Sequence, residues 1–159
     1  MCDPAQRDKT VGKHIGTHPT IIEEAIGAKS WLDYIDLLHE QIHAHHDSDE
    51  LYIVFVCNKG RHRSEARRYA LTRILGKAGY KVTTDSICED SWLSHGCQAK
   101  GLGKCSVCNE KNKGQRVKEL IGTSIARIDL LDEMLREKVI AKDFAEAETI
   151  AKRILAEQA

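Results

Sequence analysis

The chain has 159 residues, enough for one domain with a hydrophobic core, 1–159. Its 24 basic and 24 acidic side chains balance, so its overall charge does not mark a protein that binds polyanions with its whole surface. No apolar run approaches the roughly 20 residues that span a bilayer, and the polar first residues lack the hydrophobic region of a secretory signal. We therefore expect an intracellular protein, cytoplasmic or of another compartment, without a membrane partner.

Two helices are predicted in the first third of the chain, after irregular structure over residues 1–18. His18-Pro19-Thr20 is typical of a helix start, and Gly27 is expected to stop that helix. Ser30 is predicted to cap a second, longer helix. The apolar side chains of the two helices are Ile21, Ile22, Ala25 and Ile26, and Trp31, Leu32, Ile35, Leu38 and Ile42.

Three histidines lie near the end of the second predicted helix, at positions 39, 43 and 46. Their spacing would place them on one side of the helix, where they could ligate a metal. Histidine near a helix C-terminus also interacts favourably with the helix dipole. The sequence shows no acidic or cysteine partner for them, which favours the second interpretation.

The centre of the chain predicts a strand, a loop and a helix. Leu51–Val56 consists of aliphatic and aromatic residues, the composition of a strand buried on both faces. A helical stripe runs from residue 65 to 75, a glycine-bounded turn follows, and residues 81–87 predict a second strand. We expect an α/β fold in which helices flank a small parallel sheet.

Two strands are few for a sheet, which usually has four to six. Three explanations would supply the missing strands. They are short strands in the N-terminal segment, a first strand absent from this chain, or an edge completed by a second copy or a partner chain.

The loop between the predicted strand and helix has the features of a phosphate-binding loop. It joins the C-terminal end of a strand to the N-terminus of a helix, where free backbone amides favour anions. Residues 59–73 carry six Lys or Arg against one Glu, so a basic surface for nucleic acid is conceivable despite zero net charge. The predicted phosphate-binding residues are Asn58, Lys59, Gly60, Arg61, His62, Arg63 and Ser64.

The same loop has the spacing C-x5-R-S, which suggests thiol chemistry. A helix N-terminus and nearby cations would stabilise a thiolate at Cys57. Arg63 could hold two oxygens of a phosphate, and Ser64 could position the sulfur or assist its departure. In the alternative interpretation, Cys57 is the last residue of a buried strand and has no chemical role.

Two families share features with this loop. The stretch Ile53-Val-Phe-Val-Cys57, followed by Arg63-Ser64 and Glu65-Ala66, resembles the opening of the low-molecular-weight protein tyrosine phosphatases. The stretch Cys57-x-x-Gly60-x-His62-Arg63-Ser64 is more similar to the C-terminal domain of the RNase adapter protein RapZ. That family also has a glycine-bounded turn and a short strand after its helix, so the resemblance covers residues 30–86.

The two resemblances imply different functions. The adapter family implies recognition of a sugar phosphate or RNA, so the expected partner is a phosphate-bearing small molecule or RNA. The phosphatases imply an enzyme with Cys57 as nucleophile and need an aspartate acid, usually in an Asp-Pro pair near the C-terminus. Here the only such pair is Asp3-Pro4, and the other candidates for the acid are Asp85, Asp90 and His62. Whether the protein is an enzyme stays open, and the adapter-like function is favoured.

A cysteine-rich segment over residues 88–113 lacks any regular pattern. Cys105 and Cys108 form a C-x2-C knuckle, Cys97 precedes it, and Cys88 or His95 could supply a fourth ligand. A glycine-containing loop of this length needs something to order it, and zinc takes four such ligands. The predicted set is Cys88, Cys97, Cys105 and Cys108 around a structural zinc. The alternative is that these cysteines are ordinary thiols.

The remaining chain, over residues 115–157, predicts two helices. Apolar residues recur at spacings of three and four up to residue 138, and again from Phe144 to Leu155. A break is expected at residues 139–142. We therefore predict a helical hairpin that packs on the sheet or on another subunit.

Overall fold

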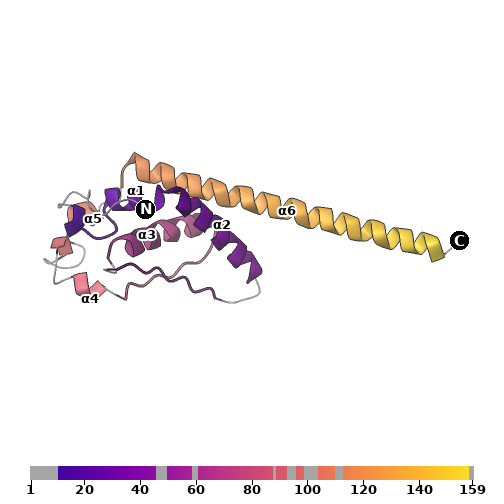
Figure 1. Ribbon diagram of the computed structural model, residues 1–159, viewed down its shortest axis with the longest axis horizontal. Helices are drawn as coiled ribbons and strands as arrows, with labels where there is room; N and C mark the ends of the chain where they lie inside the picture. The colour runs from indigo at the N-terminus through magenta and orange to yellow at the C-terminus, as the bar shows by residue number, and fades with distance from the viewer. Residues whose placement is uncertain are drawn as a thin grey trace.

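The computed structural model describes residues 11–45, 50–58, 61–87, 89–92, 96–98, 104–109 and 113–157, with side chains at all of these positions except 90, 91, 96 and 138–157. These residues are built mainly from helices (Figure 1). The longer helices are α1 (Pro19–Ile26), α2 (Lys29–Ala44), α3 (Arg63–Lys77) and α6 (Gln115–Glu157). The short ones are η2 (Val11–Lys13), α4 (Glu89–Trp92), η3 (Gly96–Gln98) and α5 (Ser106–Asn109).

The main hydrophobic core lies where α1, α2, α3 and the first half of α6 meet. Helix α1 contacts α3 and α6, and α2 packs along α6. Burial of these apolar faces removes them from water and is the main force that holds the helices together. The most deeply buried core residues are Ile21, Ile22, Ala25, Ile26, Trp31, Ile35, Ala66, Ala70, Leu71, Ile74, Val117 and Ile128.

The start of α1 is confirmed as predicted. His18 is the N-cap residue, and its Nδ1 accepts a hydrogen bond of 3.3 Å from the backbone amide of Thr20. Pro19 occupies the first helical position, where its missing N–H costs nothing. The apolar face of α1 is buried, and the helix ends before Gly27.

Helices α2 and α6 run in the same direction, in register. Trp31 on α2 bonds to Ser124 on α6, and further along the same helices Asp36 pairs with Arg127. The predicted apolar stripe of α2 is confirmed, with Trp31 and Ile35 fully buried. The predicted cap at Ser30 is wrong, because α2 begins at Lys29 with Ala28 as its N-cap residue.

The predicted α/β fold is wrong. No residue within the described ranges belongs to a β-strand. The run predicted as a strand buried on both faces is extended chain with one face covered: Ile53 and Phe55 pack on the core, while Val54 and Val56 are 72% and 86% exposed. An apolar run predicts extended backbone, but it does not supply the neighbouring chain whose N–H and C=O groups would pair with it.

The second predicted strand is likewise extended chain, and it follows a helix end of the kind expected. After α3, Gly79 adopts a φ of +92°, and the amide of Tyr80 bonds to the carbonyl of Leu75 at 3.0 Å. This is a Schellman motif, in which glycine takes the left-handed position that closes the helix. Further on, the Arg68 guanidinium bonds to Thr84 at 2.7 Å and holds the segment against α3.

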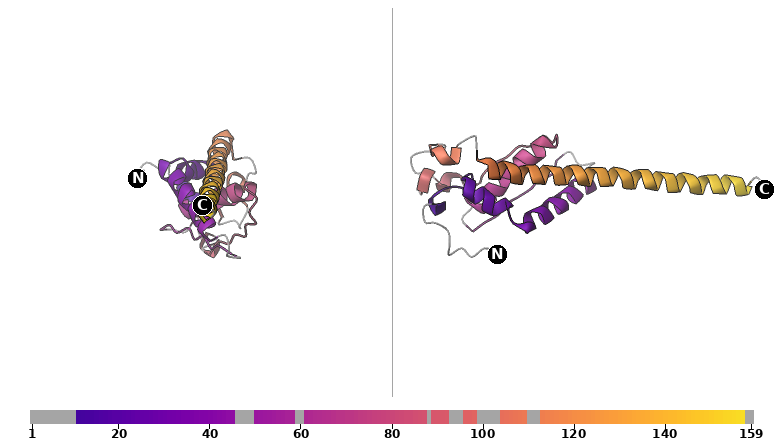
Figure 2. Two further views of the ribbon diagram at one scale, coloured as in Figure 1. Left: turned by 90° about the vertical axis from the view of Figure 1, so that its right-hand side faces the viewer. Right: turned by 90° about the horizontal axis from the view of Figure 1, so that it is seen from above.

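The predicted C-terminal hairpin is also wrong, because residues 115–157 form the single helix α6. Its 43 residues correspond to a length of about 65 Å, and its second half extends past the helical core (Figures 1 and 2). After Gly122 the sequence of this helix contains no glycine or proline that would break it. No helix in the described part of the chain is both long and apolar enough to cross a membrane.

Candidate metal centre and phosphate-binding loop

Four potential metal ligands from distant parts of the sequence meet beside α5. His14 follows η2, Cys97 lies in η3, Cys105 directly precedes α5, and Cys108 lies within α5. The imidazole Nδ1 and the three Sγ atoms all lie within 4.8 Å of one another. This Cys3His cluster could hold a metal ion.

The distances between the ligand atoms suit a tetrahedral ion. The Sγ atoms of Cys97 and Cys108 are 3.6 Å apart, and His14 Nδ1 lies 3.4 Å from the Sγ atoms of both Cys105 and Cys108. A tetrahedral zinc with Zn–S bonds of about 2.3 Å and a Zn–N bond of about 2.0 Å has ligand–ligand edges of roughly 3.5–3.8 Å. The side chains are therefore arranged close to the spacing that such an ion requires.

Backbone amides support the sulfur atoms. The amides of Cys108 and Val107 donate to Cys105 Sγ, and the amide of Ile15 donates to Cys108 Sγ. The amide of Asn109 bonds to the carbonyl of Cys105 at 3.0 Å and closes the turn. Hydrogen bonds of this kind favour the thiolate, the form of cysteine that binds metals.

The thiols of the knuckle differ in acidity. Burial, together with the neighbouring Cys97 sulfur, raises the pKa of Cys108 to about 12. Burial also acts to raise the pKa of Cys105, but the amide and thiol donors around it outweigh that effect and lower its pKa. A cation in the cluster would offset the cost of burying the Cys108 thiolate.

Three further side chains enclose the cluster. Lys113 is buried, and its ammonium donates to the carbonyl oxygens of Cys108 at 2.5 Å and Val107 at 3.2 Å. Trp92 and Ile15 are buried against Cys108 and form a small apolar cluster separate from the main core. The candidate metal centre is therefore packed against the apolar side chains of Trp92 and Ile15, and the Lys113 ammonium lies beside it.

The sequence predicted three of these four ligands. Cys97, Cys105 and Cys108 come together as expected, whereas Cys88 and His95 lie outside the described residues. His14 was missed because it lies 91 residues before Cys105, and no spacing rule connects the two. The one available signal was a histidine in a polar, glycine-containing N-terminal segment.

The N-terminal segment that carries His14 also contacts the predicted phosphate loop. The amide of Gly16 donates a hydrogen bond of 2.6 Å to the carbonyl of Arg61. Gly16 is buried at this contact. The contact to Arg61 therefore lies only two positions along the chain from His14, one of the four potential metal ligands.

The predicted loop leads from the extended segment into the N-terminus of α3. Cys57 and Asn58 end the segment, and α3 begins at Arg63. The N-cap residue, His62, makes no side-chain cap, while its carbonyl accepts from the amide of Ala66 at 2.9 Å. The first amides of a helix that lacks such a cap are available to an anion.

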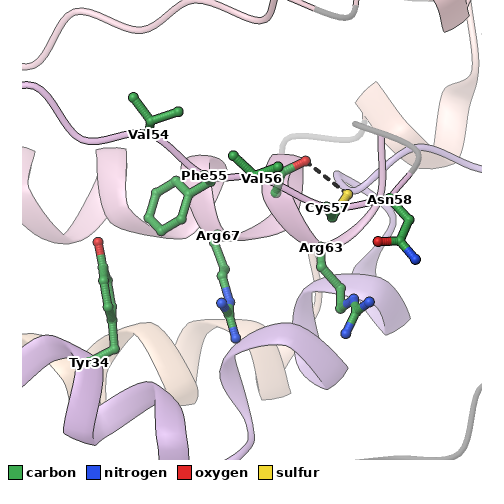
Figure 3. Close-up of a pocket in the computed structure, with 9 residues that line it drawn as sticks. Tyr34, Val54, Phe55, Val56, Cys57, Asn58, Arg63 and Arg67 are labelled. Atoms are coloured by element: carbon green, nitrogen blue, oxygen red, sulfur yellow. Dashed lines mark hydrogen bonds between the residues drawn. The ribbon is translucent and has the colours of Figure 1, made fainter.

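Cys57 and Ser64 face each other across this loop. The Cys57 Sγ and Ser64 Oγ atoms are 3.2 Å apart, within hydrogen-bond reach (Figure 3). Cys57 is half-buried, and Ser64 is buried in the first turn of α3. A hydroxyl in this position can donate to the sulfur and stabilise a thiolate.

A pocket of about 360 Å³ opens beside this pair. Of the predicted loop residues, Asn58, Arg63 and Ser64 line it, together with Cys57. None of the described residues that line it carries a carboxylate. The described residues that line it are Tyr34, Val54, Phe55, Val56, Cys57, Asn58, Arg63, Ser64 and Arg67.

The two arginines of the pocket project from the same side of α3 (Figure 3). They are four residues apart, so they are neighbours on the helix surface. The Arg67 Nε atom is buried and has no hydrogen-bond partner among the described residues. Arg68, in contrast, pairs with the buried Glu65. The Glu65 carboxylate, in the first turn of α3, is therefore paired with Arg68 and is not among the residues that line the pocket.

The remaining predicted loop residues are Lys59, Gly60, Arg61 and His62. Arg61 and His62 are half-buried and do not line the pocket. Lys59 and Gly60 lie outside the described residues. Among the candidate acids, the Asp85 carboxylate accepts from the amide of Ser86 at 2.7 Å and also does not line the pocket, and the side chain of Asp90 is outside the described set.

Comparisons of the chain with protein-family models, with curated proteins and with solved structures found no match. The resemblance of the loop to two families therefore stays a prediction that rests on the loop residues themselves.

Proposed function

We propose that the protein binds the phosphate group of a sugar phosphate or of an RNA backbone in the pocket at the N-terminus of α3. The observation that carries this proposal is the composition of the pocket wall. Arg63 and Arg67 supply two guanidinium groups, Asn58 and Ser64 supply neutral hydrogen-bond donors, and none of the described residues in the lining is acidic. An anion is the ligand that this set of donors fits.

The physical chemistry of the first turn of α3 supports the same ligand. A helix N-terminus carries a partial positive charge and uncapped amides. A guanidinium can hold two phosphate oxygens at once, and its hydrogen bonds to a charged acceptor are about twice as strong as neutral ones. The buried Arg67 Nε would gain a partner that the described residues do not provide.

The size of the pocket and the loop sequence narrow the choice of phosphate ligand. A volume of about 360 Å³ is at the small end of ligand pockets, enough for a sugar phosphate or one nucleotide unit of a chain. The loop Cys57-x-x-Gly60-x-His62-Arg63-Ser64 resembles that of the adapter family, for which such ligands are expected.

We also propose that the Cys3His cluster binds zinc in a structural role. Soft thiolates with one imidazole are ligands that select zinc, and four protein ligands leave no position open for substrate. Three thiolates and one zinc ion carry a net charge of −1, which the buried Lys113 ammonium would balance. The function of the ion would be to hold η3, α5 and residues 11–18 together.

Titration calorimetry on the full chain tests the phosphate site. The probes are inorganic phosphate, ribose 5-phosphate and a single-stranded RNA of mixed sequence. We expect at least one probe to bind. Arg63→Gln and Arg67→Gln should each weaken the affinity for that probe about tenfold or more, because charge-assisted hydrogen bonds contribute about 1.5–3 kcal/mol. Arg116→Gln is the matched control, since Arg116 is exposed on α6 outside the pocket.

The outcomes of the titration separate the two ligand types. Binding of RNA that weakens steeply as salt rises would assign the site to a nucleic-acid backbone. Binding of ribose 5-phosphate with less dependence on salt would assign it to a small molecule. If no probe binds, or if Arg116→Gln weakens binding as much as Arg63→Gln, the proposal is wrong.

A second candidate function is a cysteine-dependent phosphatase, which the 3.2 Å contact between Cys57 and Ser64 favours. The Cys57 thiolate would attack phosphorus, form an S–P bond and expel the alcohol, which takes a proton from an acid. Water would then break the S–P bond, releasing phosphate and returning the thiolate. Among the described residues, the pocket lining includes no carboxylic acid to supply the proton, so binding remains the preferred function.

Hydrolysis of an aryl phosphate by wild type and by Cys57→Ser tests this alternative. An aryloxide leaves without strong acid assistance, so the assay detects the nucleophile even where an acid is missing. Turnover that Cys57→Ser abolishes would establish thiol catalysis. Absence of turnover in a protein that still binds phosphate would leave the pocket as a binding site.

A further inference from the structure

A second cluster of ligand-type side chains lies between α2 and α6, away from the cysteines. His39 and His43 project from α2, and Asp132 projects from α6. The Asp132 Oδ1 atom lies 2.7 Å from His39 Nε2 and 3.1 Å from His43 Nε2, and the two Nε2 atoms are 3.1 Å apart. Three potential ligand atoms therefore converge on one point.

Hydrogen bonds alone account poorly for this triangle. A carboxylate accepts but does not donate, so each imidazole would have to present an Nε2–H to Oδ1. Two such N–H groups would then point at the same oxygen with their nitrogens only 3.1 Å apart, where their hydrogens repel. If one imidazole is instead an acceptor, it presents a lone pair to the carboxylate oxygen. A cation at the centre uses the lone pairs of all three atoms at once.

The helices that carry these residues are held in register by two other polar contacts. The Trp31 indole N–H bonds to Ser124 Oγ at 3.0 Å, and Arg127 bonds to both carboxylate oxygens of Asp36 at 2.7 Å. Both contacts lie closer to the N-terminal ends of α2 and α6 than His39 and Asp132 do. Ligands that rigid, braced elements position lose little entropy when they bind an ion.

Exposure within the cluster is uneven. His39 is buried at 4% exposure, whereas the side chains of His43 and Asp132 are 41% and 33% exposed. One ligand is therefore fixed against the core, and the other two lie at the surface, where a dissolved ion can reach them. This side of the cluster also leaves room for water or an external ligand.

We propose that His39, His43 and Asp132 form a second metal site, which binds a divalent transition-metal ion such as zinc. Two imidazoles from adjacent turns of one helix and a carboxylate from a neighbouring helix suit zinc. Ligand–ligand edges of about 3.3 Å are expected around an ion with bonds of about 2.0 Å, so the exposed side chains would move outward by a few tenths of an ångström. Three protein ligands leave a coordination position for water.

This site differs in character from the Cys3His cluster. The cysteine cluster offers four ligands and is closed, whereas the histidine–aspartate site offers three and is open on the His43 side. An ion with an exchangeable water can coordinate an anionic ligand or lower the pKa of that water. The ion here would also link α2 to α6 and stabilise their contact.

The metal content of the full chain tests the proposal. Wild type, His43→Gln and Asp132→Asn are equilibrated with zinc buffered at a fixed low free concentration, and bound zinc per chain is measured. We expect each variant to bind one zinc fewer than wild type. Asp36→Asn is the matched control, because it removes a carboxylate from the same interface without touching the three ligands.

Cobalt substitution assigns each ion to its site. Cobalt bound by thiolates shows an intense sulfur-to-metal charge-transfer band, and cobalt bound by nitrogen and oxygen does not. We expect His43→Gln to keep the charge-transfer band of wild type and to lose only the second equivalent. If His43→Gln binds as much zinc as wild type, or if Asp36→Asn loses an equivalent too, the proposal is overturned. His43 is partly exposed, so its substitution should leave the fold intact.

Discussion

A side chain on Gly16 would collide with the backbone at the start of α3. A Cβ atom built there would lie 2.1 Å from the carbonyl oxygen of His62 and 2.5 Å from the amide nitrogen of Ala66. Glycine therefore lets the N-terminal segment approach the helix closely enough for its amide to bond to Arg61. This contact joins the segment that carries His14 of the Cys3His cluster to the chain that enters α3, where the proposed phosphate pocket lies.

The first prediction is that Gly16→Ala destabilises the protein by several kcal/mol. The atoms in the way belong to the backbone of His62 and Ala66, so neither can rotate aside. Overpacking of this kind typically costs about 1–3 kcal/mol, and occasionally more. Denaturant unfolding measures the loss, with Gly12→Ala as the control because nothing lies within 4 Å of a Cβ at that position. Equal effects of the two substitutions would contradict the close contact.

The second prediction concerns removal of the metal. A chelator should shift the tryptophan fluorescence to longer wavelength, because Trp92 is buried only within the small cluster that includes Ile15 and Cys108. So small an apolar cluster cannot stay ordered on hydrophobic burial alone. The melting temperature should fall in the same titration.

Variants assign that response to the cysteine cluster. Trp92→Phe should abolish the fluorescence shift while leaving the loss of stability, since Trp31 lies in the main core. Cys108→Ser should behave like chelated wild type, whereas Cys57→Ser should respond to the chelator as wild type does. Cys57 lines the proposed phosphate pocket and is not part of the Cys3His cluster. A chelator without effect on wild type would exclude a structural ion.

The helices could be predicted from the sequence because their signals are local. The start of α1 at Pro19 and the buried stripe of α2 follow from capping and periodicity within a few residues. The sheet could not be predicted in this way, because an apolar run such as Leu51–Val56 records side-chain chemistry and not the presence of a pairing neighbour. The continuity of α6 past residue 139 was missed because the interruption of its apolar pattern was taken for a break in the backbone.

In the candidate sites, too, the residues that are close in sequence were predicted, and those that only tertiary contacts bring together were missed. Cys105 and Cys108 were found because their spacing is short, and the loop from Cys57 to Ser64 was found for the same reason. His14 and Asp132 were missed, since each meets its partners across about 90 residues and only the packing of the helices brings them together. Local spacing can identify part of a ligand set, but the remaining ligands depend on tertiary contacts.

The third prediction is a pH dependence of the pair between Asp36 and Arg127. The hydrogen bond from Arg127 lowers the pKa of Asp36, more than burial of the carboxyl raises it. Because the pKa is lower in the folded state, the pair stabilises the protein above the unfolded pKa of about 3.9, and this contribution is lost as pH falls through the folded value. Wild type should therefore be more stable than Asp36→Asn at neutral pH, and the difference should shrink in acid.

Urea unfolding of both proteins over a pH series measures this difference. Raising the salt concentration should also reduce it at neutral pH, because both side chains are partly exposed and their charges are screened. Asp33→Asn, at an exposed position on the same helix, serves as the control. A difference that grows toward low pH would have the wrong sign for a lowered pKa.

The last prediction concerns the buried hydrogen bond from Trp31 to Ser124. Both side chains are almost completely buried, so Ser124→Ala would leave the indole N–H without an acceptor and cost about 1–3 kcal/mol. Thr123→Ala is a closely matched control. The hydroxyls of Thr123 and Ser124 each donate to the carbonyl four residues earlier at 3.0 Å, but only that of Ser124 accepts from Trp31.

A double-mutant cycle isolates the interaction itself. In a Trp31→Phe background no indole donor remains, so Ser124→Ala should cost less there than in wild type, by about 1 kcal/mol. Thr123→Ala should cost the same in both backgrounds. If Ser124→Ala is equally destabilising with and without the indole, its effect comes from the lost bond to Leu120 or from the cavity, and the contact does not fix the register of α2 on α6. The same register brings Asp132 to His39, so its loss should also weaken zinc binding at the proposed second site.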